Sequence, residues 1–301
     1  MQPKARRLTD EPLLPTRVLA RCERLRLTPQ KRNTNRARGE HATGKGGTST
    51  EFSDYRNYVA GDDVRFVDWN IFSRLGEPYL KLYQHEEEQQ IPVILDASAS
   101  MAPEGKFDLA RQVAAAFGTI ALASRERASC YAAGVRGRRA EVLPPCSGTA
   151  ARGRMMAFLG GLEAKGSMPM EEVVEEALKR HRGKGVAVLI SDFMTFGEVE
   201  PALNRLGAAG LVPYCVQVLS PGEIDPEVDQ DVRLVDAETG MELDVSAMKD
   251  LMGLYQAERA ALENRLAAAC RRRGGRFAVA SSATPIETFL VEEIVRKGWA
   301  R

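Results

Sequence analysis

Short apolar runs alternate with segments of helical periodicity over residues 91–301. The runs at 91–95, 186–192 and 211–219 predict buried strands, because strands of a parallel sheet are covered on both faces and need not alternate. Further strands are expected at 129–135, 140–143 and 276–280. Helices are expected at 106–125, 150–162, 170–181, 199–208, 248–273 and 285–297. This alternation predicts the α/β class, with a doubly wound, mostly parallel sheet covered by helices on both faces.

The first ninety residues show a different pattern, which divides the chain into three expected parts. Residues 1–50 form a basic N-terminal arm with a polar, Gly-rich mobile loop after residue 28. Residues 51–90 form a small β-rich layer, in which the segment from Tyr79 alternates like a half-exposed strand. Residues 91–301 form the α/β domain, with a hairpin inserted near 231–245.

The N-terminal arm carries most of the charge asymmetry of the chain. Residues 1–47 hold 12 Lys and Arg against 4 Asp and Glu, so that the net charge of +1 divides into +8 here and −7 elsewhere. A basic arm can bind nucleic acid, or it can pack as a helix on an acidic body. The periodicity at 13–27 favours a short helix. Its apolar side consists of Leu14, Val18, Cys22 and Leu25.

The composition is that of an ordinary globular protein, with 44% hydrophobic and 28% charged residues. The five cysteines are scattered and form no CxxC pair, which favours a reducing compartment over a disulfide framework or a zinc site. No apolar run approaches the roughly 18 residues of a membrane span. We therefore expect a cytoplasmic protein.

Three oxygen-bearing side chains follow the strand predicted at 91–95. Asp96, Ser98 and Ser100 occupy every second position directly after it, and open α/β sheets bind ligands at the carboxyl ends of their strands. A carboxylate and two hydroxyls suit a hard cation such as Mg²⁺. The alternative is that these residues merely cap the next helix.

The block that begins at Glu51 reads EFSDYRNYVAGDDVRFVDWNIFSR and is followed by YLKLYQHEEE and VILDASASM. These motifs resemble a bacterial family called domain of unknown function 58, in its cytoplasmic short form. The resemblance extends to SDF at 191–193 and on to the C-terminal helices, and thus covers nearly all of the chain. It implies a fold similar to von Willebrand factor type A domains, preceded by a small β-rich N-terminal region.

The resemblance also implies a metal-ion-dependent adhesion site for Mg²⁺ or Mn²⁺. Ser98 and Ser100 would bind the cation directly, Asp96 directly or through water, and Asp192 through its waters. A carboxylate of the partner would fill the open position. Where such domains have a direct threonine ligand, this chain has Met168, whose thioether is a poor ligand for Mg²⁺. A shift by one residue would let Ser167 supply the hydroxyl instead.

Acidic and basic residues interleave in the block before the α/β domain. Asp62, Asp63 and Arg65 are a candidate partner-binding surface. The structural interpretation, which we favour, is that Arg–carboxylate pairs and turn-capping aspartates hold an irregular layer together. Trp69 is expected to anchor this layer by burial.

The leading hypothesis for function is a non-enzymatic protein-interaction module, Mg²⁺-dependent through the DxSxS site. The resemblance implies a partnership with an AAA+ ATPase of the MoxR type in protein assembly or maturation, and a client that presents a carboxylate. The chain itself has no phosphate loop, since GKGG at 44–47 lacks the required spacing. One alternative is a metal-dependent hydrolase that uses Asp96, Asp192 and the Asp62–Asp63 pair. Another is nucleic-acid binding through the basic arm, with affinity that falls with salt.

Overall fold

The computed structural model describes residues 12–28, 51–84, 88–134, 139–166, 168–194, 199–226, 232–235, 242–245 and 248–301. Most of the basic arm, including the loop expected after residue 28, lies outside these ranges. The chain divides into two compact units, one of residues 33–88 and the other of residues 1–32 with 89–301. Within the described part of the chain, no helix has the length and apolar character to cross a membrane.

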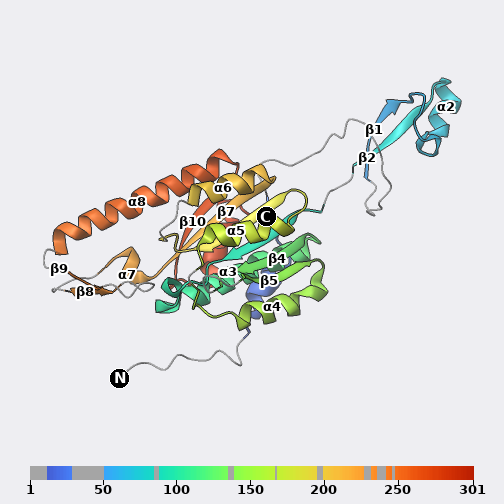
Figure 1. Ribbon diagram of the computed structural model, residues 1–301. Helices are drawn as coiled ribbons and strands as arrows, with labels where there is room; N and C mark the ends of the chain where they lie inside the picture. The colour runs from blue at the N-terminus through green and yellow to red at the C-terminus, as the bar shows by residue number, and fades with distance from the viewer. Residues whose placement is uncertain are drawn as a thin grey trace. The chain divides into compact units, whose positions relative to one another are not determined.

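A six-stranded sheet forms the centre of the larger unit (Figure 1). Its strand order is β10-β7-β6-β3-β4-β5. All neighbours are parallel except β4 and β5, which are antiparallel. The strands are β3 (Gln90–Leu95), β4 (Arg127–Ala132), β5 (Glu141–Cys146), β6 (Gly185–Ser191), β7 (Leu211–Leu219) and β10 (Arg276–Ser281). The chain runs outward from β3 to β5 and returns to the other side of β3 at β6, which confirms the predicted doubly wound sheet.

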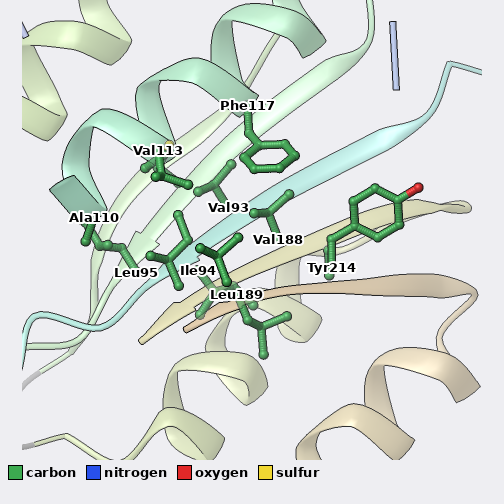
Figure 2. Close-up of a cluster of buried hydrophobic side chains, with 14 of the residues drawn as sticks. Val93, Ile94, Leu95, Ala110, Val113, Phe117, Val188, Leu189 and Tyr214 are labelled. Atoms are coloured by element: carbon green, nitrogen blue, oxygen red, sulfur yellow. The ribbon is translucent and has the colours of Figure 1, made fainter. Parts of the chain in front are cut away.

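Helices cover both faces of this sheet (Figure 2). On one face α3 (Lys106–Ala123) packs on the strands and contacts α1 (Thr16–Cys22), α4 (Arg152–Gly161) and α9 (Ile286–Phe289). The other helices that contact the sheet are α5 (Met170–Arg180), α6 (Val199–Ala208) and α8 (Met248–Arg272). A short helix, α7 (Pro221–Ile224), follows β7, and a π-helical segment, Leu290–Val295, follows α9. The strands β8 (Val232–Val235) and β9 (Glu242–Val245) pair antiparallel, as expected for a hairpin near 231–245.

The core follows from the alternation of side chains along the buried strands. Val93, Val188 and Tyr214 are register partners on neighbouring strands, and they lie on the face that α3 covers with Val113 and Phe117 (Figure 2). Their neighbours in the chain, such as Ile94 and Leu189, lie on the opposite face, and all of these side chains are buried. Because both faces of β3 and β6 are apolar, an alternation of polar and apolar residues cannot fix their register, so the packing of the helices on each face has to do so.

The helix expected within residues 13–27 belongs to this core. All four residues of its predicted apolar side are buried, and α1 contacts α3. Directly after it, the backbone of Arg26 pairs with that of Arg301 through hydrogen bonds of 2.8 and 3.0 Å in the two directions. This part of the N-terminal segment is thus joined to the C-terminal end of the larger unit.

The smaller unit contains an antiparallel pair, β1 (Glu51–Asn57) and β2 (Tyr79–Gln84), as the sequence predicts for this layer. Between them lie a 3₁₀ turn, Val64–Phe66, and a seven-residue helix, α2 (Trp69–Leu75). The side chain of Asp68 caps α2 by accepting hydrogen bonds from the backbone of Asn70 and Ile71.

The expectation that Trp69 anchors this layer by burial is wrong. Its side chain is 61% exposed and meets Phe72 edge-on, with ring centroids 5.8 Å apart. Trp69 is the first residue of α2, and it is the preceding Asp68 that is turned inward, where it contacts Tyr55 and Lys81 on the two strands. The cap therefore takes the buried position and leaves the indole outside.

Candidate metal-binding site

The carboxyl ends of β3 and β6 meet where the strand order reverses. The two strands are parallel neighbours with Leu95 opposite Ile190, and the N–H of Asp96 donates to the carbonyl of Ile190 at 2.8 Å. Asp96 and Asp192 follow directly, one on each strand. This is the place at which doubly wound sheets bind their ligands.

Asp96 is buried, with 2% of its surface exposed, and both of its oxygens have protein partners. Oδ1 accepts the N–H of Ser98 at 2.9 Å, and Oδ2 accepts the hydroxyl of Ser191 at 2.5 Å. Burial raises the pKa of Asp96, and the nearby Asp192 raises it further, whereas the hydrogen bonds from Ser191 and Ser98 lower it. These two hydrogen bonds hold the carboxylate of Asp96 at the start of the DxSxS loop.

The two serines of the motif lie side by side above Asp96. Ser98 Oγ and Ser100 Oγ are 2.9 Å apart, within hydrogen-bonding distance of each other. The same separation, about 2.9 Å, is expected between adjacent ligands of an octahedral Mg²⁺ at about 2.0–2.1 Å from each. The spacing of these two hydroxyls is therefore compatible with a hard cation as well as with a hydrogen bond between them.

The helix-capping interpretation of this motif is not what the structure shows. The 3₁₀ turn Ala99–Met101 begins after Ser98 without a hydrogen bond from its side chain. The residue that precedes α3 is Gly105, in the left-handed conformation, and it likewise supplies no side-chain cap. The two serine hydroxyls bond to each other, and Asp96 accepts from the backbone of Ser98 and the hydroxyl of Ser191 instead of from the first turn of α3.

A second loop, between α4 and α5, reaches the DxSxS loop through its backbone. Gly166 donates to the carbonyl of Ala97 at 2.6 Å and accepts from the N–H of Ala99 at 3.0 Å. Met168, which the resemblance places at the threonine position, is 7% exposed and belongs to the hydrophobic core. Its thioether therefore packs among apolar side chains. Ser167, the other candidate in this loop, lies outside the described residues.

Asp192 has a partner that the sequence did not reveal. Its Oδ2 accepts a hydrogen bond from Lys106 Nζ at 3.2 Å, and its Oδ1 accepts the N–H of Met194 at 3.1 Å. Lys106, the first residue of α3, is only 2% exposed and also contacts Glu223 Oε1 at 2.6 Å. The candidate site therefore contains a buried ammonium group as well as two buried carboxylates.

Glu223 is held in turn by the short helix after β7. It forms a capping box with Ser220, whose backbone N–H it accepts at 2.7 Å and whose hydroxyl accepts its own N–H at 3.2 Å. The hydroxyl of Tyr255 on α8 donates to the carbonyl of Glu223 at 2.8 Å. The carboxylate that faces Lys106 is thus held by the capping box of α7, and the backbone of the same residue is held by α8.

A shallow depression of about 220 Å³ lies beside this edge, between Met194 and α8. It is smaller than the roughly 300–1,000 Å³ of typical small-molecule sites. Its α8 lining consists of Tyr255, Glu258, Arg259, Leu262 and Arg265. Across the described part of the chain, no three His, Cys, Asp or Glu side chains gather as a metal cluster. A cation here would depend on hydroxyl ligands.

The partner-binding candidates Asp62, Asp63 and Arg65 lie in the smaller unit. Asp62 accepts two hydrogen bonds from the guanidinium of Arg56, both of 2.7 Å, and one from the N–H of Val59. Asp63 precedes the 3₁₀ turn and pairs with Arg65, 2.6 Å away. These pairs lower the pKa of both aspartates. Each carboxylate thus has a structural role within the unit, in agreement with the interpretation that Arg–carboxylate pairs hold this layer together.

Comparison with known proteins finds similarity in sequence to one group and in structure to others. "Uncharacterized protein Rv1480" of Mycobacterium tuberculosis is 28% identical over 233 residues, which cover 75% of this chain and 72% of that protein. The solved structure of BatB from Bacteroides thetaiotaomicron has 14% identity and a TM-score of 0.42, covering 69% of this chain and 98% of that one. For von Willebrand factor type A from Catenulispora acidiphila the identity is 17% and the TM-score 0.35, with 47% and 35% covered.

The family resemblance drawn from the motifs is confirmed by a family model. The model described as "Protein of unknown function DUF58" matches residues 54–265, which include β2, the DxSxS loop and most of α8. The mostly parallel sheet and its strand order agree with the von Willebrand factor A-like fold that the resemblance implies. The chain belongs to the DUF58 family.

Proposed function

We propose that this chain is a non-enzymatic protein-interaction module of the cytoplasm. Its binding site would lie at the carboxyl ends of the central strands β3 and β6. The observation that carries the proposal is that the hydroxyls of Ser98 and Ser100 lie 2.9 Å apart in the loop that begins at the buried Asp96. This loop follows β3, at the point where the strand order of the sheet reverses. The depression of about 220 Å³ beside this site is small for a small-molecule substrate. Ser191, whose hydroxyl donates to Asp96, is itself buried and so is not presented to a substrate as a nucleophile.

A divalent cation, Mg²⁺ or Mn²⁺, would complete this site. Ser98 and Ser100 would be its direct ligands, Asp96 would bind it directly or through water, and Asp192 would contact its waters. Ser167 is the proposed source of a further hydroxyl. When bound, the cation offers an open position to a carboxylate of the partner, since Mg²⁺ takes only part of its ligands from the protein. The client would therefore present an Asp, a Glu or a chain terminus.

The smaller unit offers a second surface suited to protein contact. Seven large apolar side chains of this unit are exposed, the largest fractions being 66% for Leu75, 64% for Val59 and 61% for Trp69. A concentration of exposed apolar side chains on so small a unit is typical of an interaction surface. Asp62, Asp63 and Arg65 would lie among them as polar neighbours. The exposed apolar residues are Tyr55, Val59, Val64, Phe66, Trp69, Phe72 and Leu75.

The proposed partner is an AAA+ ATPase of the MoxR type, acting with this chain in the assembly or maturation of a client protein. This part of the proposal rests on the family resemblance. The sequence lacks a phosphate loop, so the ATPase would supply the hydrolysis of ATP and this chain would supply recognition.

Affinity capture from native cells, with Mg²⁺ and with a chelator, tests the proposal. We expect the wild type to capture an AAA+ ATPase, and we expect less of it to be recovered with Trp69→Ala. Capture of the client should decrease with Ser98→Ala or when a chelator is present. Leu254→Ala is the control, because Leu254 is 57% exposed on α8, outside both surfaces. Unchanged recovery of every protein in all variants would refute the assignment of these two surfaces.

A further inference from the structure

Lys106 is a buried cation whose position needs an explanation. Its side chain is 2% exposed, and its ammonium lies between the carboxylates of Asp192, at 3.2 Å, and Glu223, at 2.6 Å. Withdrawing an ammonium from water is costly unless acidic groups surround it. The arrangement is therefore a specific ion-pair triad, built from the start of α3, the end of β6 and the helix α7.

The location of Lys106 in α3 is unfavourable for a positive charge. It is the first residue of an 18-residue helix, and helix N-termini carry a partial positive charge that favours anions. The unfavourable location is offset by its acidic partners, one of which, Asp192, is the second acid of the candidate metal site. The structure thus places a fixed positive charge where a metal would need a free carboxylate.

We propose that the Lys106 ammonium is a built-in competitor of the divalent cation, which neutralises Asp192 when no metal is bound and thereby sets the affinity for metal. This inference rests on the proposed site and names its regulation. Asp192 Oδ2 already accepts a hydrogen bond from Lys106 and Oδ1 one from Met194, so the negative charge of this carboxylate is compensated by the protein before any metal-bound water donates to it. A cation at Ser98 and Ser100 binds against the repulsion of this ammonium.

The consequence is a site that is stable without metal and binds metal weakly. Removing Lys106 should leave Asp192 uncompensated, and a divalent cation would then supply the missing positive charge. We expect Lys106→Met to tighten the binding of Mn²⁺ by about tenfold or more, the order of magnitude for removing a unit positive charge that is paired with one of the site's carboxylates.

Titration of the purified full chain with Mn²⁺ alone, by calorimetry and by the paramagnetic resonance of free Mn²⁺, measures this effect. Lys179→Met is the matched control, since it removes the same charge from an exposed pair with Glu176, and it should bind Mn²⁺ like the wild type. In the double variant Lys106→Met/Asp192→Asn the gain should vanish. Equal affinity of Lys106→Met and wild type, or a gain that persists in the double variant, overturns the proposal.

A second variant covers the case in which Lys106→Met does not fold. Glu223→Gln removes the nearer acidic partner and leaves the ammonium to Asp192 alone, so the affinity for Mn²⁺ should fall below that of the wild type; an unchanged affinity again overturns the proposal. No partner protein enters these titrations. Failure of the capture experiment with an intact Lys106 effect would therefore refute only the proposed function, and the reverse result would refute only this inference.

Discussion

Gly166 is the point at which an added methyl group should separate the second loop from the DxSxS loop. A Cβ at this residue would lie 2.8, 2.8 and 2.9 Å from the carbonyl oxygens of Ala133, Gly134 and Ala97. These are backbone atoms, which cannot rotate away as a side chain would. Overpacking of this kind costs about 1–3 kcal/mol, and loss of the two hydrogen bonds of Gly166 adds about 1 kcal/mol each. We expect Gly166→Ala to destabilise the larger unit by roughly 3–5 kcal/mol.

Urea unfolding followed by tryptophan fluorescence measures this change. The chain has two tryptophans, and in a Trp69→Phe background the buried Trp299 reports on the larger unit alone. Gly160→Ala is the control, because a Cβ at this residue of α4 meets nothing within 4 Å; it should be neutral or stabilising by up to about 1 kcal/mol. If the free energy of unfolding of Gly166→Ala differs from that of this control by less than about 0.5 kcal/mol, the two loops do not approach each other as closely as described.

Three further expectations concern acid stability, thiols and the buried carboxylate. The pKa of Asp62 is lowered by its arginine partner, so the contribution of this carboxylate to the stability of the smaller unit is present above pH 3.8 and lost as the pH falls through the lowered value. Acid titration followed by Trp69 fluorescence should show that the stability of Asp62→Asn depends less on pH than that of the wild type. Identical profiles for the two proteins would contradict this. Burial raises the pKa of Cys22 to about 12, so its thiol should not react with a disulfide reagent at pH 8 until urea is added. Prompt reaction of Cys22 in the native protein would contradict this expectation. Ser191→Ala removes a hydrogen bond to the buried Asp96 and should cost about 1–3 kcal/mol in urea unfolding, whereas wild-type stability would show that this bond contributes nothing.

The larger unit was predictable from the sequence because its signals are strong and local. The apolar run at 91–95 and the periodicity at 106–125 need no knowledge of their neighbours, and both elements lie within a few residues of their expected ends. The seven-residue helix α2 was not expected, since a helix of two turns has too little periodicity to be seen. Trp69 was misplaced for the same reason: without the helix, nothing indicated that Asp68 would be its cap.

The candidate site was only half visible in the sequence. Asp96, Ser98 and Ser100 share one motif, whereas Lys106 meets Asp192 and Glu223 from 86 and 117 residues away. Such contacts depend on the order of strands and on where α7 lies, which no local pattern encodes. The signal available was a lone lysine at the start of an otherwise Ala-rich helix, a location that the helix dipole disfavours.

The edge strand β5 restricts how partners can attach. Its sequence, Glu141–Cys146, contains Pro144 and Pro145, which have no N–H to offer to an added strand. Edge strands blunted in this way resist pairing with other chains, including the pairing that leads to aggregation. A binding partner is therefore hindered from extending the central sheet at this side, and side-chain contacts rather than backbone ladders would have to determine which proteins associate here.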